Sequence, residues 1–273
     1  MLQRIIPSSG ELLPAIGFGT WQTFDVDNTG IYPQLAQVLQ QLHKAGGRLI
    51  DSSPMYGKSE AVIGEVTSGM EVAGDLFYAT KVWTTGLEAG MRQLETSFKR
   101  MKRATMDLVQ VHNLTDWETH LPQLRYLKEQ GKIRYIGITH YTDDSHEALE
   151  KIIRQEQLDF VQFNYSITGR HAEQRLLDAA ADRGVATIIN RPFGQGNLFK
   201  KVMGKSLPPW ASEMGIETWA AYFLKYILAH PAVTCVIPAT RNPVHAAEIV
   251  GAGIGELPAA AFRDRMAAYL ESL

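Results

Sequence analysis

The chain has 273 residues, of which 45% are hydrophobic and 21% are charged, and its formal net charge is −2. This balance provides no basic field for nucleic acid or an anionic membrane surface, and no apolar run reaches the ~18 to 20 residues of a membrane span. The single cysteine, Cys235, cannot form an internal disulfide and lies in the apolar run VTCVIPA, which is typical of a buried side chain.

Eight short, apolar, β-rich segments occur along the chain. In chain order, strands are expected at AIGFGT (15–20), GRLIDSS (47–53), DLFYATK (75–81), MDLVQVH (106–112), IRYIGITH (133–140), DFVQFNY (159–165), VATIIN (185–190) and VTCVIPA (233–239). Apolar residues at helical spacing predict helices within 32–46, 87–101, 117–131, 145–157, 173–184, 217–230 and 243–252. Gly46, Gly131 and Gly184 end three of them, where a C-terminal glycine is expected.

The alternation of strands and helices predicts a parallel sheet, and the near-continuous apolar strands indicate that both sheet faces are buried. Eight units is the number that closes a (β/α)₈ TIM barrel. An open doubly wound sheet is the alternative, but no G-x-G-x-x-G follows the first strand. We expect one α/β domain over residues 1–273, with an N-terminal hairpin in LQRIIPSSGELLP (2–14) and an extra C-terminal helix in LPAAAFRDRMAAYLESL (257–273).

Ionisable side chains follow three successive strands. Asp51, Lys81 and His112 end the second, third and fourth strands, and Tyr56 lies five residues beyond Asp51. Each alone has a plain explanation, such as turn capping, solvent exposure or packing. Because the active sites of such barrels lie at the C-terminal ends of the strands, the joint occurrence indicates a site at one rim.

These four side chains can together form a proton donor. The ammonium of Lys81 favours the phenolate of Tyr56 and lowers its pKa from about 10, and the carboxylate of Asp51 keeps Lys81 charged. His112 can donate a hydrogen bond to a substrate oxygen. The sequence contains no evident nucleophile–base pair and no clustered metal ligands, so we expect no metal. An acid that protonates an oxygen favours carbonyl reduction with hydride from a cofactor.

The chain resembles the aldo-keto reductases from GFGTW (17–21) to IPATRNPVHAAE (237–248). The matching motifs are LIDSSPMYG with its D-x₄-Y spacing, ATKVW, DLVQVH, GKIRYIGI, DFVQFNYS and VIPATRNP. The resemblance implies a catalytic tetrad of Asp51, Tyr56, Lys81 and His112, with Tyr56 as the general acid. It also implies that aldehydes or ketones are reduced to alcohols with NADPH, while NADH remains possible.

The same resemblance implies cofactor contacts after the later strands. Nicotinamide contacts are implied for Thr139, His140, Gln162 and Asn190, although family members commonly have Ser-Asn at 139–140. Pyrophosphate contacts are implied for Arg191, Pro192, Phe193, Gly194, Gly196 and Asn197, in a glycine-containing loop. Contacts to the adenosine end are implied for Thr240, Arg241, His245 and Glu248, and Arg241 favours NADPH because an arginine can bind the 2′-phosphate.

Trp21, Trp83 and Asn113 follow the first, third and fourth strands and are expected to line the carbonyl pocket. The short loop after His112 and the short C-terminal tail predict an open pocket. Two alternatives remain: a cofactor-sensing subunit with little turnover, and a lyase that uses Lys81 as a Schiff base. We expect a cytoplasmic protein, or the processed form of an exported one, that acts on small carbonyl compounds as a monomer or weak oligomer.

Overall fold

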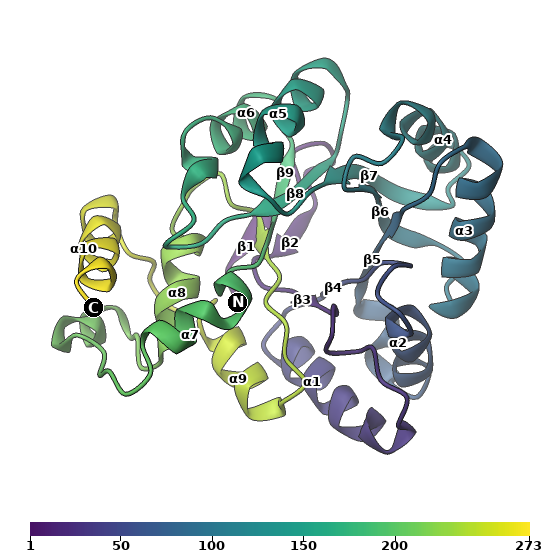
Figure 1. The fold of residues 1–273 in the computed structure, drawn as a ribbon. Helices are drawn as coiled ribbons and strands as arrows, with labels where there is room; N and C mark the ends of the chain where they lie inside the picture. The colour runs from purple at the N-terminus through teal and green to yellow at the C-terminus, as the bar shows by residue number, and fades with distance from the viewer.

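A computed structural model describes residues 1–273 and contains an eight-stranded parallel sheet (Figure 1). Its strands are β3 Phe18–Gly19, β4 Leu49–Asp51, β5 Phe77–Val82, β6 Met106–His112, β7 Ile133–Thr139, β8 Phe160–Asn164, β9 Ala186–Asn190 and β10 Cys235–Val236. They pair in sequence order, each with the next, from β3 to β10. Each strand coincides with one expected segment, so the eight-strand prediction is confirmed.

The first and last strands close this sheet into a barrel. Ile16, just before β3, forms a parallel bridge with Val236 of β10, and the amide of Gly17 donates to the carbonyl of Val236 at 2.9 Å. A Cβ atom on Gly17 would lie 2.7 Å from the carbonyl oxygen of Leu49, so β3 approaches β4 this closely only because the residue is glycine. The closed (β/α)₈ barrel is therefore confirmed over the open sheet.

Helices surround the barrel (Figure 1). They are α1 Tyr32–Lys44, α2 Ser59–Ser68, α3 Leu87–Arg100, α4 Trp117–Glu129, α5 His146–Gln155, α6 Leu176–Asp182, α8 Trp219–Leu228 and α9 Pro243–Gly251, with 3₁₀ turns at η1 Thr29–Ile31, η2 Glu71–Asp75, η3 Asp143–Ser145 and η4 His171–Glu173. Gly46, Gly131 and Gly184 have φ values of +86°, +67° and +62°, which glycine adopts readily at helix C-termini. None of the helices combines the length and apolar character that crossing a bilayer requires.

An N-terminal hairpin closes the end of the barrel opposite the strand C-termini. Its strands, β1 Gln3–Ile5 and β2 Leu12–Pro14, pair antiparallel. Ile6 and Leu13 are buried and cluster with Leu49 and Phe77, the first residues of β4 and β5. The predicted hairpin is therefore confirmed at the bottom of the barrel.

The last helix packs outside the barrel. The segment after β9 forms η5 Gly194–Gly196, α7 Asn197–Lys201 and η6 Pro209–Met214, and the chain finishes with α10 Ala260–Glu271. The rings of Phe262 and Tyr269 lie 5.2 and 5.8 Å from the ring of Trp210, and Tyr222 donates to the carbonyl of Met266 at 2.9 Å. In Figure 1, α10 lies beyond α8, away from the centre of the barrel. The extra helix is confirmed, and it leaves the mouth of the barrel open.

Candidate active site

A buried ion pair joins β4 to β5. The ammonium of Lys81 is fully buried and donates to Oδ2 of Asp51 at 2.6 Å and to the carbonyl of Ser52 at 2.7 Å. Burial alone would lower the pKa of Lys81, but the Asp51 carboxylate and Tyr56 raise it above its usual value. Lys81 is therefore charged at neutral pH, as the sequence predicted.

The phenol of Tyr56 lies against this pair. The ammonium nitrogen of Lys81 is 5.2 Å from the centroid of the Tyr56 ring, and the ring of His112 meets the Tyr56 ring edge-on at 5.7 Å between centroids. Burial raises the pKa of Tyr56 above 10, and Lys81 opposes this only in part. Lys81 lowers this pKa, as the sequence analysis predicted, but burial outweighs its effect, so the pKa lies above its usual value. The phenol is protonated at neutral pH, which is the state that a proton donor requires.

His112 is a neutral hydrogen-bond donor. Burial and the nearby Lys81 lower the pKa of His112 to about 2. The hydroxyl of Ser53 lies 2.9 Å from Nδ1 of His112, and the amide of Met55 donates to the same hydroxyl at 3.3 Å. In the tautomer in which the Ser53 hydroxyl donates to Nδ1, the single imidazole proton of His112 lies on Nε2.

These groups adjoin a cavity of about 520 Å³ at the C-terminal ends of the strands. Twelve of the predicted site residues line it: Trp21, Asp51, Tyr56, His112, Asn113, Thr139, Gln162, Asn190, Arg191, Pro192, Phe193 and Gly196. The sequence analysis missed Met55, Tyr141 and Phe199, which also line it. Met55 and Tyr141 are direct neighbours of predicted site residues, and this adjacency is the only signal in the sequence that marks them.

Three buried side-chain atoms of residues that line the cavity lack hydrogen-bond partners: Nε2 of Gln162, Oδ1 of Asn190 and Oδ1 of Asn113. Gln162 accepts from the hydroxyl of Thr139 at 2.9 Å, which leaves its Nε2 buried and unpaired. Asn190 donates to the carbonyl of His140 at 3.1 Å, which leaves its Oδ1 buried and unpaired. Such groups cost free energy unless a ligand pairs with them. The free donor of Gln162 and the free acceptor of Asn190 together match a carboxamide, the group that nicotinamide carries.

Two predicted contact residues lie beside this cavity rather than on its wall. The ring of His140 stacks on the ring of Tyr141 at 5.2 Å between centroids, and its Nδ1 lies 3.3 Å from the hydroxyl of Thr142. Only the backbone carbonyl of His140 reaches Asn190. The ring of Trp83 is 42% exposed and lies 6.4 Å from the ring of His112.

A second cavity of about 400 Å³ adjoins the first. It is lined by predicted residues Thr240, His245 and Glu248 and by Trp219, which the sequence analysis missed, while Phe193, Phe199 and Ala239 line both cavities. Gly194, Asn197 and Arg241 line neither cavity. The side chain of Arg241 is exposed, and its backbone carbonyl accepts a hydrogen bond from Nε2 of Gln34 at 2.6 Å.

The family model for the aldo/keto reductase family matches residues 15–268. The chain belongs to the aldo/keto reductase family. An aldo-keto reductase from Mycolicibacterium smegmatis is 28% identical over 72% of this chain and 70% of its own length. Methylglyoxal reductase YeaE from Escherichia coli is 25% identical over 86% of this chain and 84% of its own. Members of this family are NAD(P)H-dependent oxidoreductases, and this chain is an enzyme of that class.

Solved aldo-keto reductases share the fold of this one. The structure of an aldo-keto reductase from Klebsiella pneumoniae in complex with NADPH gives a TM-score of 0.82 at 22% identity, over 99% of this chain and 96% of that one. The structure of a thermostable aldo-keto reductase in complex with the inhibitor epalrestat gives a TM-score of 0.79 at 26% identity. The match covers 100% of this chain and 99% of that one.

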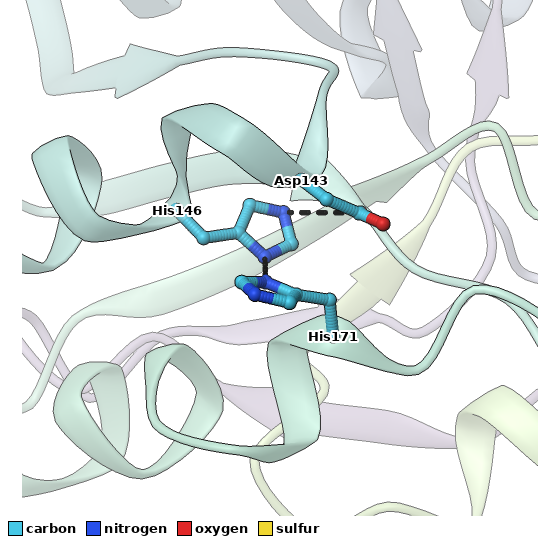
Figure 2. Close-up of side chains that lie close together, drawn as sticks. All are labelled: Asp143, His146 and His171. Atoms are coloured by element: carbon cyan, nitrogen blue, oxygen red, sulfur yellow. Dashed lines mark hydrogen bonds and ion pairs between the residues drawn. The ribbon is translucent and has the colours of Figure 1, made fainter.

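This aldo-keto reductase has another cluster of titratable side chains outside both cavities (Figure 2). Nε2 of His146 lies 3.0 Å from Oδ1 of Asn164, whose Nδ2 donates to Asp143 at 2.6 Å. Nδ1 of His146 lies 2.9 Å from Nδ1 of His171. Asp143 and His171 lie at opposite nitrogens of the His146 ring, and one N or O atom from each of the three side chains lies within 4.8 Å of the others. This cluster links the loops after β7 and β8 of the reductase.

The neutral state of His112 in this reductase predicts a flat pH profile. With its pKa at about 2, His112 keeps the same charge across the range of about pH 5 to 8 in which an ordinary histidine titrates. We therefore expect kcat/KM for carbonyl reduction to show no inflection near pH 6.5. Initial rates over this range, corrected for acid decay of the cofactor, check the prediction. A one-proton fall in rate below pH 6.5 that Ser53→Ala displaces would contradict it.

Proposed function

We propose that this protein reduces aldehyde or ketone carbonyls to alcohols with NADPH, and that Tyr56 is the general acid. The observation that carries the proposal is the placement of a protonated Tyr56 and a neutral His112 on the wall of one cavity, with a charged Lys81 at 5.2 Å from the Tyr56 ring. A bound reduced nicotinamide supplies hydride. Similarity to methylglyoxal reductase YeaE supports a small carbonyl compound as substrate.

The proton in this proposal comes from Tyr56. As the carbonyl carbon gains hydride, its oxygen becomes basic, and the phenol transfers its proton to that oxygen. The ammonium of Lys81, 5.2 Å from the ring centroid, stabilises the phenolate that remains. His112 donates a second hydrogen bond to the same oxygen, which orients the substrate and stabilises the developing charge.

The cofactor-binding residues are proposed from the two adjoining cavities. Gln162 Nε2 and Asn190 Oδ1 pair with the nicotinamide carboxamide, and Thr139 holds Gln162 in place. The loop that begins at Arg191 contacts the diphosphate, through Pro192, Phe193, Gly194, Gly196 and Asn197. The second cavity takes the adenosine end, beside Thr240, His245 and Glu248.

The test is a titration of the purified protein with NADPH and with NADH, followed by addition of 4-nitrobenzaldehyde or methylglyoxal. Tryptophan fluorescence reports binding, and absorbance at the nicotinamide band reports turnover. Binding followed by consumption supports the reductase, whereas binding without consumption of any carbonyl favours a cofactor-sensing subunit. The lyase alternative is disfavoured because Lys81 is fully buried and donates to Asp51 and Ser52. Borohydride trapping of a substrate on Lys81 would support that alternative.

Arg241 is proposed to distinguish NADPH from NADH. Its side chain is exposed beside Thr240, which lines the second cavity, and it can reach a 2′-phosphate there. We expect Arg241→Ala to weaken NADPH binding about tenfold or more, and NADH binding less than about threefold, because only NADPH loses a charge-assisted contact. Fluorescence titrations measure both dissociation constants, with exposed Arg92→Ala on α3 as control. An equal loss of affinity for NADPH and NADH would show that Arg241 does not distinguish between the two cofactors.

A further inference from the structure

Arg191 is a cation without an acidic partner on the wall of the larger cavity. It follows β9 directly and is half-buried. Its guanidinium lies 4.1 Å from the centroid of the Tyr141 ring, and it forms no ion pair and no side-chain hydrogen bond. A half-buried guanidinium is usually paired, because removing a charge from water costs free energy that a counter-ion offsets. Arg191 therefore indicates an anionic ligand.

The other charged groups on this cavity are already neutralised. Asp51 is paired with Lys81 at 2.6 Å, and burial keeps His112 neutral because its pKa is lowered to about 2. No other Asp, Glu, Lys or Arg side chain lines the cavity. Arg191 consequently supplies the one uncompensated charge of its wall, and such a charge favours an anion as ligand.

The backbone and the Tyr141 ring both fix the position of Arg191. Its φ is +51°, a left-handed conformation that non-glycine residues rarely adopt, and its carbonyl accepts from the amide of Gly194 at 2.9 Å. A guanidinium stacked on an aromatic face keeps its edge N–H groups available for a bidentate acceptor. Burial lowers the pKa of Arg191, and the residue lines the same cavity as Tyr56 and His112.

We propose that Arg191 binds a carboxylate of the substrate, so that the preferred substrates are oxo acids: aldehydes or ketones that carry a carboxylate. The inference rests on the proposed reduction at Tyr56 and names its substrate class. The cofactor diphosphate offers the same anionic chemistry. The substrate is favoured because Arg191 lines the same cavity as Tyr56 and His112 and does not line the second cavity, which is proposed to take the adenosine end.

The experiment compares a charged substrate with a neutral one of the same shape. 4-Carboxybenzaldehyde and methyl 4-formylbenzoate present the same aldehyde with and without the carboxylate. We expect the wild-type enzyme to have the higher kcat/KM for the acid, and Arg191→Gln to lower the acid-to-ester ratio by about 10- to 100-fold, mainly through KM. Arg191→Lys, which keeps the charge but loses the planar fork, should give an intermediate ratio.

Controls separate the substrate from the cofactor as the source of the anion. Lys201→Gln removes one positive charge from the end of α7, outside both cavities, and should leave the ratio unchanged. If Arg191→Gln weakens NADPH binding about tenfold and leaves the ratio unchanged, the anion is the diphosphate and the inference is overturned. A wild-type enzyme that reduces the ester but shows no acid preference also overturns it, while failure to reduce either compound counts against the proposed function itself.

Discussion

Replacing Tyr56 by phenylalanine is expected to lower kcat by about 10³-fold and to change the dissociation constant of NADPH by less than about threefold. The phenylalanine ring preserves the packing against Lys81 and His112, at 5.2 and 5.7 Å, and removes only the hydroxyl that we propose as the proton donor. Single-turnover rates with 4-nitrobenzaldehyde measure the loss in the chemical step. Fluorescence titration measures cofactor affinity in the same preparation.

A matched control for this variant is Tyr126→Phe, which removes a hydroxyl from an exposed tyrosine on α4. It should retain full turnover. If Tyr56→Phe also loses NADPH affinity or unfolds at lower urea concentration, Tyr56 has a structural role. If turnover survives in Tyr56→Phe, another group donates the proton and the assignment of the general acid is wrong.

Replacing Lys81 by methionine is expected to abolish turnover and to lower the free energy of unfolding by about 3 to 5 kcal/mol. The change leaves the carboxylate of Asp51 buried without its counter-ion, because the ion pair is nearly inaccessible to water on both sides. It also removes the donor to the carbonyl of Ser52. Urea denaturation at neutral pH measures the loss of stability, and the aldehyde assay measures turnover.

The double variant Asp51→Asn with Lys81→Met separates these two effects. Neutralising Asp51 removes the unpaired buried charge, so the double variant should be more stable than Lys81→Met alone. It should remain inactive, because no ammonium stabilises the Tyr56 phenolate. A double variant that is no more stable than the single one would mean that the ion pair is not the source of the loss. Turnover by the Lys81→Met variant would show that the ammonium of Lys81 is not required for the reaction.

The barrel could be predicted because its strands are continuous apolar runs separated by helical patterns. The lengths of the outer strands could not. Segments 15–20 and 233–239 predict full strands, yet β3 and β10 contain two paired residues each. An apolar run indicates that a segment is buried, whereas the length of a strand depends on hydrogen bonds to its neighbours. β3 and β10 lie where the first and last strands of the barrel meet, and each forms only short pairings there.

The ionisable residues at the strand ends could also be predicted, but their environments could not. The pKa of Tyr56 depends on how deeply the phenol is buried, which residue spacing does not report. The ring of His140 turns towards Tyr141 and Thr142 because of packing outside its own strand. The stacking of Arg191 on Tyr141 joins residues that follow β9 and β7, two strands that are not neighbours in the sheet.

The closure of the barrel between its first and last strands, β3 and β10, also determines the stage of folding at which the active site is complete. Ile16 and Val236 lie near opposite ends of the chain, so the entropy of loop closure opposes their pairing until the intervening units have formed. The hydroxyl oxygen of Thr20, which follows β3, lies 3.0 Å from the carbonyl oxygen of Asp51 and 3.0 Å from the hydroxyl oxygen of Ser52. The strand that closes the barrel therefore also completes the cavity wall beside the carboxylate of Asp51. A folding intermediate whose helices and strands have formed, but in which Ile16 and Val236 are not yet paired, is expected to be inactive.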